Sequence, residues 1–191
     1  MIKAVIFDCF GVLVGDGWHP FKKRYFADEP EKDAEASRLN VLSNKGLLSY
    51  TDFLEGVGKL AGISAYQVMK ELNQNPPNTQ LFDYIRTLKP NYKIGMLSNA
   101  AENWLSTLVG KENEALFDAV VLSYDIGHNK PSPEAYQKAA RALGVNVDEC
   151  VFIDDIESYV VAAEHAGMKG VLYRTPEDTI ADITAALEDD K

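Results

Sequence analysis

Five short apolar runs, each about as long as a typical β-strand, constrain the fold of this chain most strongly. They are rich in Val, Ile, Leu and Phe and cover residues 3–7, 92–97, 119–122, 150–153 and 170–173. A strand that is apolar on both faces is typical of a parallel sheet that helices cover on both sides. Amphipathic segments fill the gaps between the later runs, so the sequence predicts an α/β fold with a doubly wound parallel sheet.

Helix-capping signals mark the segments between these strands. Ser132 and Pro133 form a typical helix start, and Gly144 is placed to end the same helix. Gly167 marks a second helix end in the same way. The sequence predicts core helices over residues 101–109, 132–144, 157–166 and 175–187.

The interval between the first two strands has a different character. It shows no convincing strand pattern, and its amphipathic segments lie near residues 20–27, 31–45, 51–61 and 64–74. Ser64 and Gln67 have the spacing of a capping box, and Asn78 is placed to cap a helix that leads into the second strand. We therefore expect residues 16–76 to form a small α-helical cap, inserted into a core domain of residues 1–15 and 77–191.

Polar side chains follow three of the predicted strands where each strand ends. Asp8 follows the first, Ser98 and Asn99 follow the second, and Asp154 and Asp155 follow the fourth. Ligands of open α/β sheets bind outside the carboxyl ends of the strands, so these side chains are expected to converge there. Lys130 lies in the loop before the helix at Ser132 and is expected to join them.

This set of groups suits a phosphate together with a divalent cation. Three close carboxylates need positive charge, and Mg²⁺ accepts one or two carboxylates, a carbonyl, waters and a phosphate as ligands. Lys130 and the Ser98 hydroxyl would hold the remaining phosphate oxygens. Asp8 would then attack phosphorus in line and form an aspartyl-phosphate.

The four segments that carry these groups resemble the motifs of the haloacid dehalogenase (HAD) superfamily, in the same order. They read VIFDCFGVL at residues 5–13, MLSN at 96–99, KPSPE at 130–134 and VFIDD at 151–155. The match spans nearly the whole chain, and the inserted helices resemble the cap of many members. The resemblance implies a HAD-like, Rossmann-type core and is closest to small phosphatases with short caps.

The resemblance also implies a role for each matching residue. Asp8 would be the nucleophile and a metal ligand, and the Phe10 backbone carbonyl would be a second ligand of Mg²⁺. Asp155 would bind Mg²⁺ directly, and Asp154 directly or through water. Ser98, with Asn99 beside it, would bind the phosphoryl group, and Lys130 would steady the nucleophile and the phosphate charge.

One position departs from the phosphatase pattern D-x-D-G, because Phe10 stands where a second Asp is usual. That carboxyl protonates the leaving oxygen and later activates water, and such help is worth roughly 10²–10⁴-fold in rate. Strand alternation predicts that Phe10 points to the same side as Asp8 and that Cys9 points away. We therefore expect an impaired or altered phosphatase, with Asp16 or His19 as candidate replacements for the acid.

The departures leave other functions open. Ile156 and Tyr159 stand where relatives often carry Ser and Asn, so the protein is alternatively a weak or inactive member that binds or regulates. A 2-haloacid dehalogenase is a further alternative, because those enzymes carry an aromatic residue at the position of Phe10. Arg24 and Arg38 are then the candidate cap arginines for a carboxylate substrate.

Composition limits the partners. The chain has 19 Lys and Arg against 29 Asp and Glu, a formal charge of −10, which disfavours binding to nucleic acid or to an anionic membrane. Cys9 and Cys150 lie in apolar runs and are expected to be buried thiols of a reducing compartment. We expect a cytoplasmic protein that acts on a small phosphorylated metabolite; its oligomeric state is left open.

Overall fold

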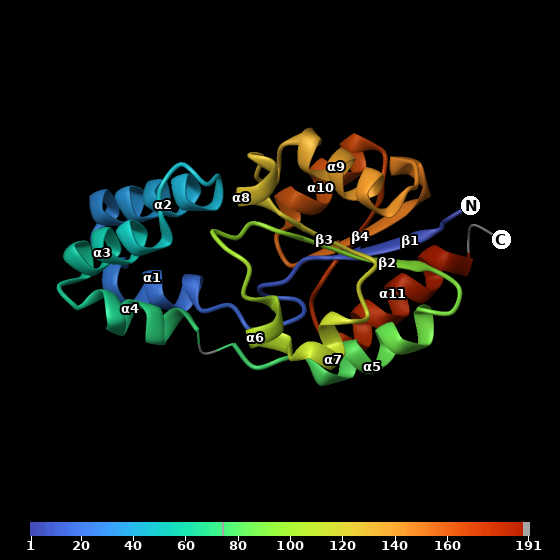
Figure 1. The fold of residues 1–191 in the computed structure, drawn as a ribbon, viewed down its shortest axis with the longest axis horizontal. Coiled ribbons are helices and arrows are strands. Elements are labelled where there is room, and N and C mark those ends of the chain that lie inside the picture. The colour runs from blue at the N-terminus through green and yellow to red at the C-terminus, as the bar shows by residue number, and fades with distance from the viewer. Residues whose placement is uncertain (74, 189–191) are drawn as a thin grey trace.

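A parallel sheet forms the centre of the computed structural model, which describes residues 1–73 and 75–188 (Figure 1). Within this part of the chain the sheet has five strands in the order β3-β2-β1-β4-β5, so the first strand lies in the middle. All neighbouring strands pair in parallel. The strands are β1 (Ala4–Phe7), β2 (Lys93–Ser98), β3 (Ala119–Leu122), β4 (Cys150–Asp154) and β5 (Lys169–Leu172).

Helices cover both faces of the sheet (Figure 1). One layer contains α9 (Pro133–Leu143) and α10 (Glu157–Ala166), and the other contains α5 (Thr79–Leu88) and α11 (Pro176–Glu188). Shorter elements lie in the connections: α6 (Leu105–Val109), α7 (Lys111–Glu114), α8 (Ser123–Ile126) and the 3-10 turn η1 (Val147–Glu149). The predicted doubly wound α/β fold is confirmed.

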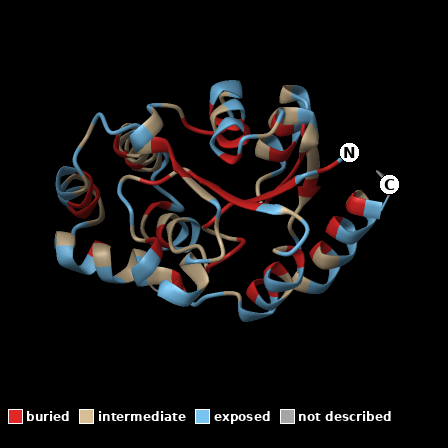
Figure 2. Ribbon diagram, turned by 45° about the vertical axis from the view of Figure 1, so that its right-hand side comes forward, coloured by how far each residue is buried: buried red, intermediate tan, exposed pale blue. Residues whose placement is uncertain are grey.

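The central strand shows why the apolar runs are continuous. Val5 and Phe7 pack into the cluster that α5 and α11 cover, whereas Ala4 and Ile6 pack into the cluster under α9 and α10. None of the four side chains is exposed, and the sheet is the buried centre of the molecule in Figure 2. Burying a large apolar side chain contributes roughly 1.5–3 kcal/mol, so both faces of β1 stabilise the fold.

The inserted helices form a second body beside the sheet (Figure 1). They are α1 (Trp18–Phe26), α2 (Pro30–Asn44), α3 (Tyr50–Ala61) and α4 (Ala65–Leu72). Their apolar faces make a cluster of their own, with Phe21, Phe53 and Val57 at its centre. The two linkers lie together, because Gly15 N–H donates to the Pro76 carbonyl over 3.2 Å. A separate cluster supports the proposed division of the chain into core and cap.

The capping predictions hold, except that Ser132 is the N-cap of α9 by position alone. Ser64 and Gln67 form the capping box of α4, and Asn78 Oδ1 accepts from Leu81 N–H at the start of α5. Gly144 ends α9 in the left-handed conformation. Ser132 takes the N-cap position of α9, but its hydroxyl donates to the Glu134 carboxylate instead of capping the backbone.

One helix prediction is wrong at its start. The helix expected over residues 101–109 begins only at Leu105. Ala100 N–H donates to Ser123 Oγ over 3.0 Å, and the Asn99 side chain is bonded to the backbone of Lys130, so the chain after β2 is tied into a loop. The helices α7 and α8 were not expected. Residue 74 of the expected cap segment and residues 189–191 lie outside the described residues.

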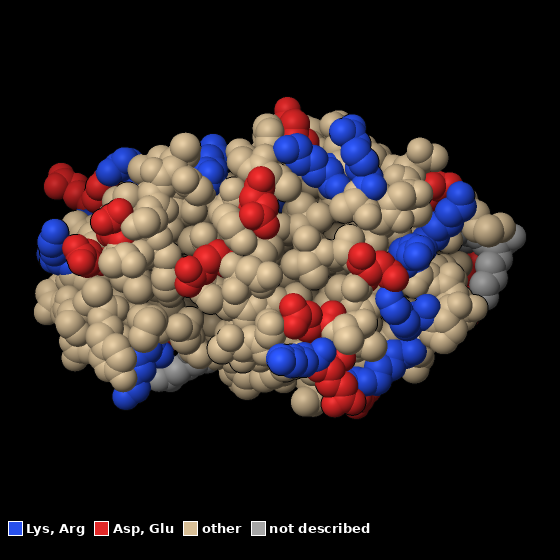
Figure 3. All heavy atoms as spheres, in the orientation of Figure 1, with Lys and Arg blue, Asp and Glu red and all other residues tan. Residues whose placement is uncertain are grey.

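On the face shown in Figure 3, Lys and Arg side chains are interspersed with Asp and Glu and do not gather in one basic patch. Among the described helices, none is long and apolar enough to cross a membrane.

Candidate active site

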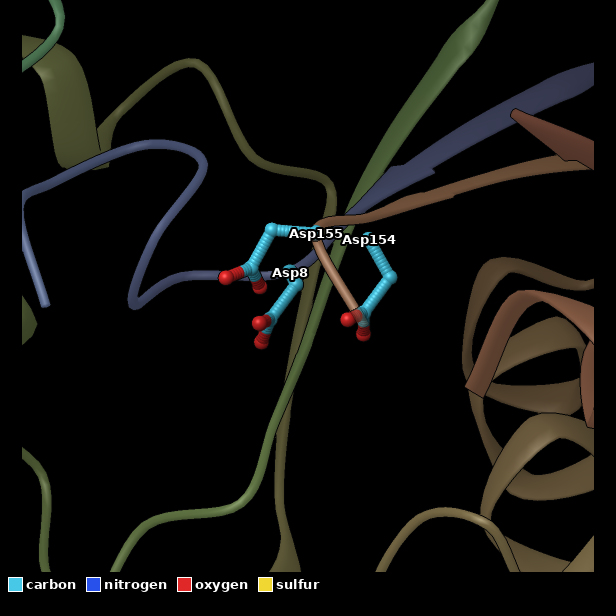
Figure 4. Close-up of side chains that lie close together, drawn as sticks. All are labelled: Asp8, Asp154 and Asp155. Atoms are coloured by element: carbon cyan, nitrogen blue, oxygen red, sulfur yellow. The ribbon is translucent and has the colours of Figure 1, made fainter. Parts of the chain in front are cut away.

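The three predicted aspartates meet at the carboxyl edge of the sheet. Asp8 follows β1 directly, and its N–H donates to the Ile153 carbonyl over 2.8 Å, which brings it beside the end of β4. Asp154 is the last residue of β4, and Asp155 follows it. In Figure 4 the three side chains leave these adjacent strand ends close together, and a ligand oxygen of each lies within 4.8 Å of the others.

Lys130 closes this cluster from the loop before α9. Its Nζ lies 2.7 Å from Asp8 Oδ1 and 2.5 Å from Asp154 Oδ2. The ammonium also lies 5.4 Å from the ring centre of Phe152 and 5.2 Å from that of Tyr159. These rings attract the cation electrostatically, and together with the two carboxylates they hold the Lys130 ammonium in place.

The electrostatics of the cluster are unbalanced toward negative charge. Burial raises the pKa of Asp8 to about 7, against the attraction of Lys130 and with the repulsion of Asp154. Burial also raises the pKa of Asp155, and the charge of Asp154 adds to that rise. Burial alone would lower the pKa of Lys130, but its two carboxylate partners outweigh that effect and raise it. In the part of the chain that the structure describes, Lys130 pairs with Asp8 and Asp154 and its charge also acts on Asp155, so a second cation would stabilise the ionised forms of all three carboxylates.

The donors present fit a hard divalent cation such as Mg²⁺. Asp155 Oδ1 is buried and has no hydrogen-bond partner, so it keeps a free lone pair beside Asp8 and Asp154. Gly11 allows this placement: it has a φ of +90°, and a Cβ there would lie 2.4 Å from Asp155 Oδ2. Carboxylate oxygens are the ligands that Mg²⁺ prefers. We therefore keep Asp8, Asp155, Asp154 and the Phe10 carbonyl as the predicted ligands.

Ser98 and Asn99 take different positions at the end of β2. Ser98 is 1% exposed, and its Oγ has no partner although it borders the same cavity as Asp8. Both polar atoms of the Asn99 side chain are used by Lys130: Oδ1 accepts from its N–H over 2.8 Å, and Nδ2 donates to its carbonyl over 3.1 Å. The free hydroxyl of Ser98 suits phosphate binding, whereas the Asn99 side chain fixes the backbone that carries Lys130.

A cavity of about 310 Å³ lies between this edge and the cap. Asp8, Ser98, Lys130 and Asp155 border it from the core. Phe10 borders it too, and its ring packs edge-on against Trp104, which also lines the cavity. Cys9, as expected, packs into the apolar core instead. A pocket of this volume holds a small molecule, because ligand sites begin at about 300 Å³.

Both candidate replacement acids border the cavity from the first turn of the cap. Asp16 Oδ2 lies 2.5 Å from His19 Nδ1. The same carboxylate accepts from the N–H groups of Trp18 and His19 at the start of α1, although the N-cap position itself belongs to Gly17. These local bonds engage Asp16, and the catalytic role of either residue stays a prediction.

The two candidate cap arginines do not border the cavity within the described residues. Arg24 pairs with Glu71 over 3.0 Å, and Arg38 pairs with Glu35 over 2.7 Å. Both side chains are more than half exposed. The site therefore offers no arginine for the carboxylate of a haloacid in this arrangement.

Sequence reasoning missed three contributors to the site. Tyr159 supplies a ring to Lys130 and a hydroxyl 3.5 Å from Asn99 Nδ2, although it was noted only as a missing Asn. Ser123 is fully buried, and its hydroxyl donates to the Asn44 carbonyl of the cap over 2.5 Å. Trp104 packs against Phe10. No sequence motif predicts these residues, because each acts through packing between segments that lie far apart in the sequence.

Comparison with known families agrees with this geometry. The family model for haloacid dehalogenase-like hydrolase matches residues 2–167. The chain belongs to this family of hydrolases. The predicted family and fold of this HAD-like hydrolase are thereby confirmed.

Known relatives of this HAD-like hydrolase include a phosphatase and a metal complex. D-ribitol-5-phosphate phosphatase from Bacteroides thetaiotaomicron is 27% identical over 188 residues, which cover 88% of this chain and 90% of that protein. A HAD family enzyme from the same organism was solved in complex with magnesium and inorganic phosphate. It matches with a TM-score of 0.71 and 25% identity over 91% of this chain and 95% of its own.

A dehalogenase is also similar in fold. L-2-haloacid dehalogenase from Xanthobacter autotrophicus, with chloropropionic acid covalently bound, matches with a TM-score of 0.65 and 21% identity. The match covers 88% of this chain and 76% of that one. At this identity the likeness concerns the fold alone.

Proposed function

We propose that this HAD-like hydrolase is a Mg²⁺-dependent phosphatase of a small soluble phosphomonoester and works through an aspartyl-phosphate on Asp8. The observation that carries the proposal is the gathering of Asp8, Asp154 and Asp155, in which Asp155 Oδ1 is buried without a partner and Lys130 is the one ammonium of the described residues that pairs with Asp8 and Asp154. The relative that hydrolyses a sugar-alcohol phosphate, as its name states, supports the substrate class. A cytoplasmic location remains part of the same proposal.

Asp8 is the nucleophile in this proposal. One oxygen is held 2.7 Å from Lys130 Nζ, which fixes the carboxylate and favours its ionised, nucleophilic form. Ser98 Oγ would donate to a phosphoryl oxygen, because it is buried, free and on the wall of the same cavity. Lys130 would then draw charge from both the nucleophile and the phosphate. Attack by Asp8 forms the new phosphorus–oxygen bond as the bond to the ester oxygen breaks.

Asp8, Asp155, Asp154 and the Phe10 carbonyl would hold the metal. When bound, Mg²⁺ supplies positive charge that offsets repulsion between the carboxylates and the incoming phosphate. The carboxylates of this chain keep that charge at the sheet edge, beside Lys130 and away from the cap. Asn99 contributes indirectly, since it holds the backbone of Lys130.

Phe10 removes the usual source of a proton at this site. Its ring borders the cavity, so the leaving oxygen meets a hydrocarbon surface where other members place a carboxyl group. The expected consequence is a slow enzyme for esters whose alcohol must be protonated as it leaves. Metal binding is unaffected, because the predicted ligand at this position is a backbone carbonyl.

The test is phosphate release from a panel of phosphomonoesters with Mg²⁺ and with a chelator. We expect Asp8→Asn to lower turnover at least about a thousandfold, as removal of a nucleophile does. Asp83→Asn is the matched control, because Asp83 is an exposed carboxylate whose ion pair with Arg86 lies outside the site. Mass spectrometry of acid-quenched wild type should find phosphate on the peptide that contains Asp8. Turnover that survives Asp8→Asn would overturn the proposal.

The ring of Phe10 also favours a second candidate, a HAD-like protein that binds Mg²⁺ and phosphate without turnover. It predicts calorimetric binding of phosphate with Mg²⁺ and phosphate release no faster than that of Asp8→Asn. Dehalogenation ranks lower, because neither candidate arginine is among the described residues that border the cavity and the acidic cluster suits a cation.

A further inference from the structure

A continuous run of aromatic rings lines the cavity from the sheet edge to the cap. It begins at Phe10 on the core, whose ring centre lies 6.0 Å from that of Trp104 in an edge-on arrangement. Trp104 lies 5.1 Å from Tyr50 of α3, and Tyr50 lies 5.9 Å from Phe53. Phe53 reaches Trp18 of α1 over 5.8 Å. All five residues border the cavity, and we call them the aromatic wall.

The aromatic wall starts at residue 10, the position at which other members carry the carboxyl group that protonates the leaving oxygen. Phe10 follows the nucleophile Asp8 by two residues, and both side chains border the same cavity. A phosphoryl group held by Ser98 and Lys130 would direct its ester oxygen away from Asp8 and toward the cap. The rest of the substrate then extends along rings that stack well on a flat, apolar body.

The cap side of the cavity offers little to a second anion. Its polar lining consists mainly of a hydroxyl and amides, from Ser37, Asn40, Asn44, Asn73 and Asn75. Among the described residues that border the cavity, the cap supplies neither Lys nor Arg. The Asp16 carboxylate, which is paired with His19, would repel a second anionic group on the substrate. This lining suits a substrate whose alcohol part carries no charge of its own before cleavage and makes a few hydrogen bonds.

We propose that the substrate is the phosphate ester of a small phenol-like alcohol, whose aromatic ring lies on the wall of Phe10, Trp104 and Tyr50. The inference deepens the proposed phosphatase function and rests on it. It joins two observations: residue 10 carries no carboxyl group to protonate a leaving oxygen, and a ring-lined surface begins at that position.

The chemistry balances without the missing acid. As Asp8 bonds to phosphorus, the bond to the aryl oxygen breaks, and its electron pair leaves on the oxygen as a phenolate. A phenolate is stable enough to leave unprotonated and takes its proton from water afterwards. Water then attacks the aspartyl-phosphate, the carboxylate of Asp8 leaves with the bonding pair, and the water proton passes to phosphate or solvent. Neither bond cleavage requires a proton from residue 10.

The first experiment compares substrates on the wild-type protein with Mg²⁺. Phenyl phosphate is set against cyclohexyl phosphate, which has a similar size, and against a fluorinated alkyl phosphate whose alcohol is as acidic as phenol. We expect kcat/KM to be lower by roughly 10²-fold or more for cyclohexyl than for phenyl phosphate, because no general acid protonates the departing cyclohexyl alkoxide. The fluorinated ester should keep kcat and show a raised KM, because it lacks the ring.

The second experiment measures the ring contact without turnover. Phenylphosphonate and cyclohexylphosphonate cannot be cleaved as esters, and their binding is followed by the fluorescence of Trp104 and Trp18. We expect phenylphosphonate to bind about three- to tenfold more tightly, the range of one or two aromatic contacts. Tyr50→Leu should remove this preference. Tyr66→Leu, which alters an exposed ring of α4 outside the cavity lining, should keep it.

The outcomes separate this inference from the proposed function. Phosphate release that depends on Asp8 but runs equally well on phenyl and cyclohexyl phosphates overturns the aryl substrate and leaves the phosphatase intact. Equal binding of the two phosphonates, or a preference that persists in Tyr50→Leu, likewise overturns the role of the wall. Absence of turnover on every ester, with Asp8→Asn no slower than wild type, overturns the phosphatase itself.

Discussion

The amino edge of the sheet, where the strands begin, and its carboxyl edge, where they end, give their carboxylates opposite electrostatic surroundings. At the amino edge, Asp118 precedes β3 and accepts from Ile94 N–H over 2.8 Å and from Lys89 Nζ over 2.8 Å. Lys93 lies 3.8 Å away, so two cations serve one carboxylate. At the carboxyl edge, one ammonium of the described residues, that of Lys130, pairs with both Asp8 and Asp154.

The pKa values follow this difference. Partial burial opposes ionisation of Asp118, but the bonds from Lys89 and Ile94 outweigh it and lower the pKa of Asp118. Burial raises the pKa of Asp8 to about 7 in spite of Lys130. At the amino edge the protein's own cations thus stabilise the ionised carboxylate, whereas at the carboxyl edge burial and the charge of Asp154 oppose ionisation, which a bound cation would relieve. Carboxyl groups with raised pKa values of this kind are typical of functional sites.

The largest expected effect concerns residue 10, which carries a phenyl ring and no carboxyl group. Phe10→Asp returns a carboxyl group to the cavity and should raise turnover of alkyl phosphates by roughly 10²–10⁴-fold, because proton transfer to the leaving oxygen becomes available. Steady-state phosphate release measures it. Phe10→Leu removes the ring without adding an acid and is the matched control. An equal gain in both variants would show that space, and not a proton, had limited the reaction.

Removing the cation of the carboxyl edge comes next in size. Lys130→Met leaves Asp8 and Asp154 buried without a partner, and breaking a buried pair costs about 3–5 kcal/mol in the free energy of unfolding. Denaturant unfolding with a chelator measures this loss, and Mg²⁺ should recover part of it. Lys32→Met, which removes an exposed partner of Glu29, should change stability little. A variant as stable as wild type would contradict the idea that this edge depends on positive charge.

A smaller effect concerns the metal itself. Mg²⁺ at a hundred times its dissociation constant should stabilise the wild type by about 2.7 kcal/mol, because only the folded chain gathers the three carboxylates. Thermal unfolding with Mg²⁺ and with a chelator measures the difference. Asp155→Asn should lose this stabilisation and leave the metal-free protein no less stable, since it relieves repulsion by Asp154. Stabilisation retained by Asp155→Asn would remove that residue from the ligand set.

The two edges also differ in how far the sequence predicted them. Asp8, Ser98 and Asp154 were predicted together because parallel topology brings strand ends to one edge whatever the side chains do. The ring of Tyr159 under Lys130 could not be predicted in this way, since it depends on how α10 packs against a distant loop.

In the loops and the cap, too, contacts between distant segments could not be predicted from local sequence patterns. The late start of α6 depends on a bond from Ala100 to Ser123, which no local pattern encodes. The aromatic wall requires Tyr50 of the cap to meet Trp104 of the core, and helix periodicity predicts α3 without saying what it faces. Parallel topology thus made the polar half of the candidate site predictable from the sequence, whereas its aromatic half depends on tertiary packing that no local pattern encodes.

The smallest expected effect tests the amino edge. Asp118→Asn should lower the free energy of unfolding by roughly 1–2 kcal/mol at neutral pH, because it weakens a charge-assisted bond to Lys89 and leaves the Ile94 N–H poorly paired. The folded pKa of Asp118 is lowered, so its contribution is complete above the ordinary pKa of an Asp, about 4, and fades as pH falls through the folded pKa. The gap between variant and wild type in denaturant unfolding should therefore narrow below about pH 4. Mg²⁺ should stabilise both proteins equally, since Asp118 lies at the edge opposite the metal ligands. If Mg²⁺ closed the difference in the free energy of unfolding between variant and wild type, the two edges would be energetically coupled. The contrast between an edge stabilised by its own cations and one stabilised by a ligand would then fail.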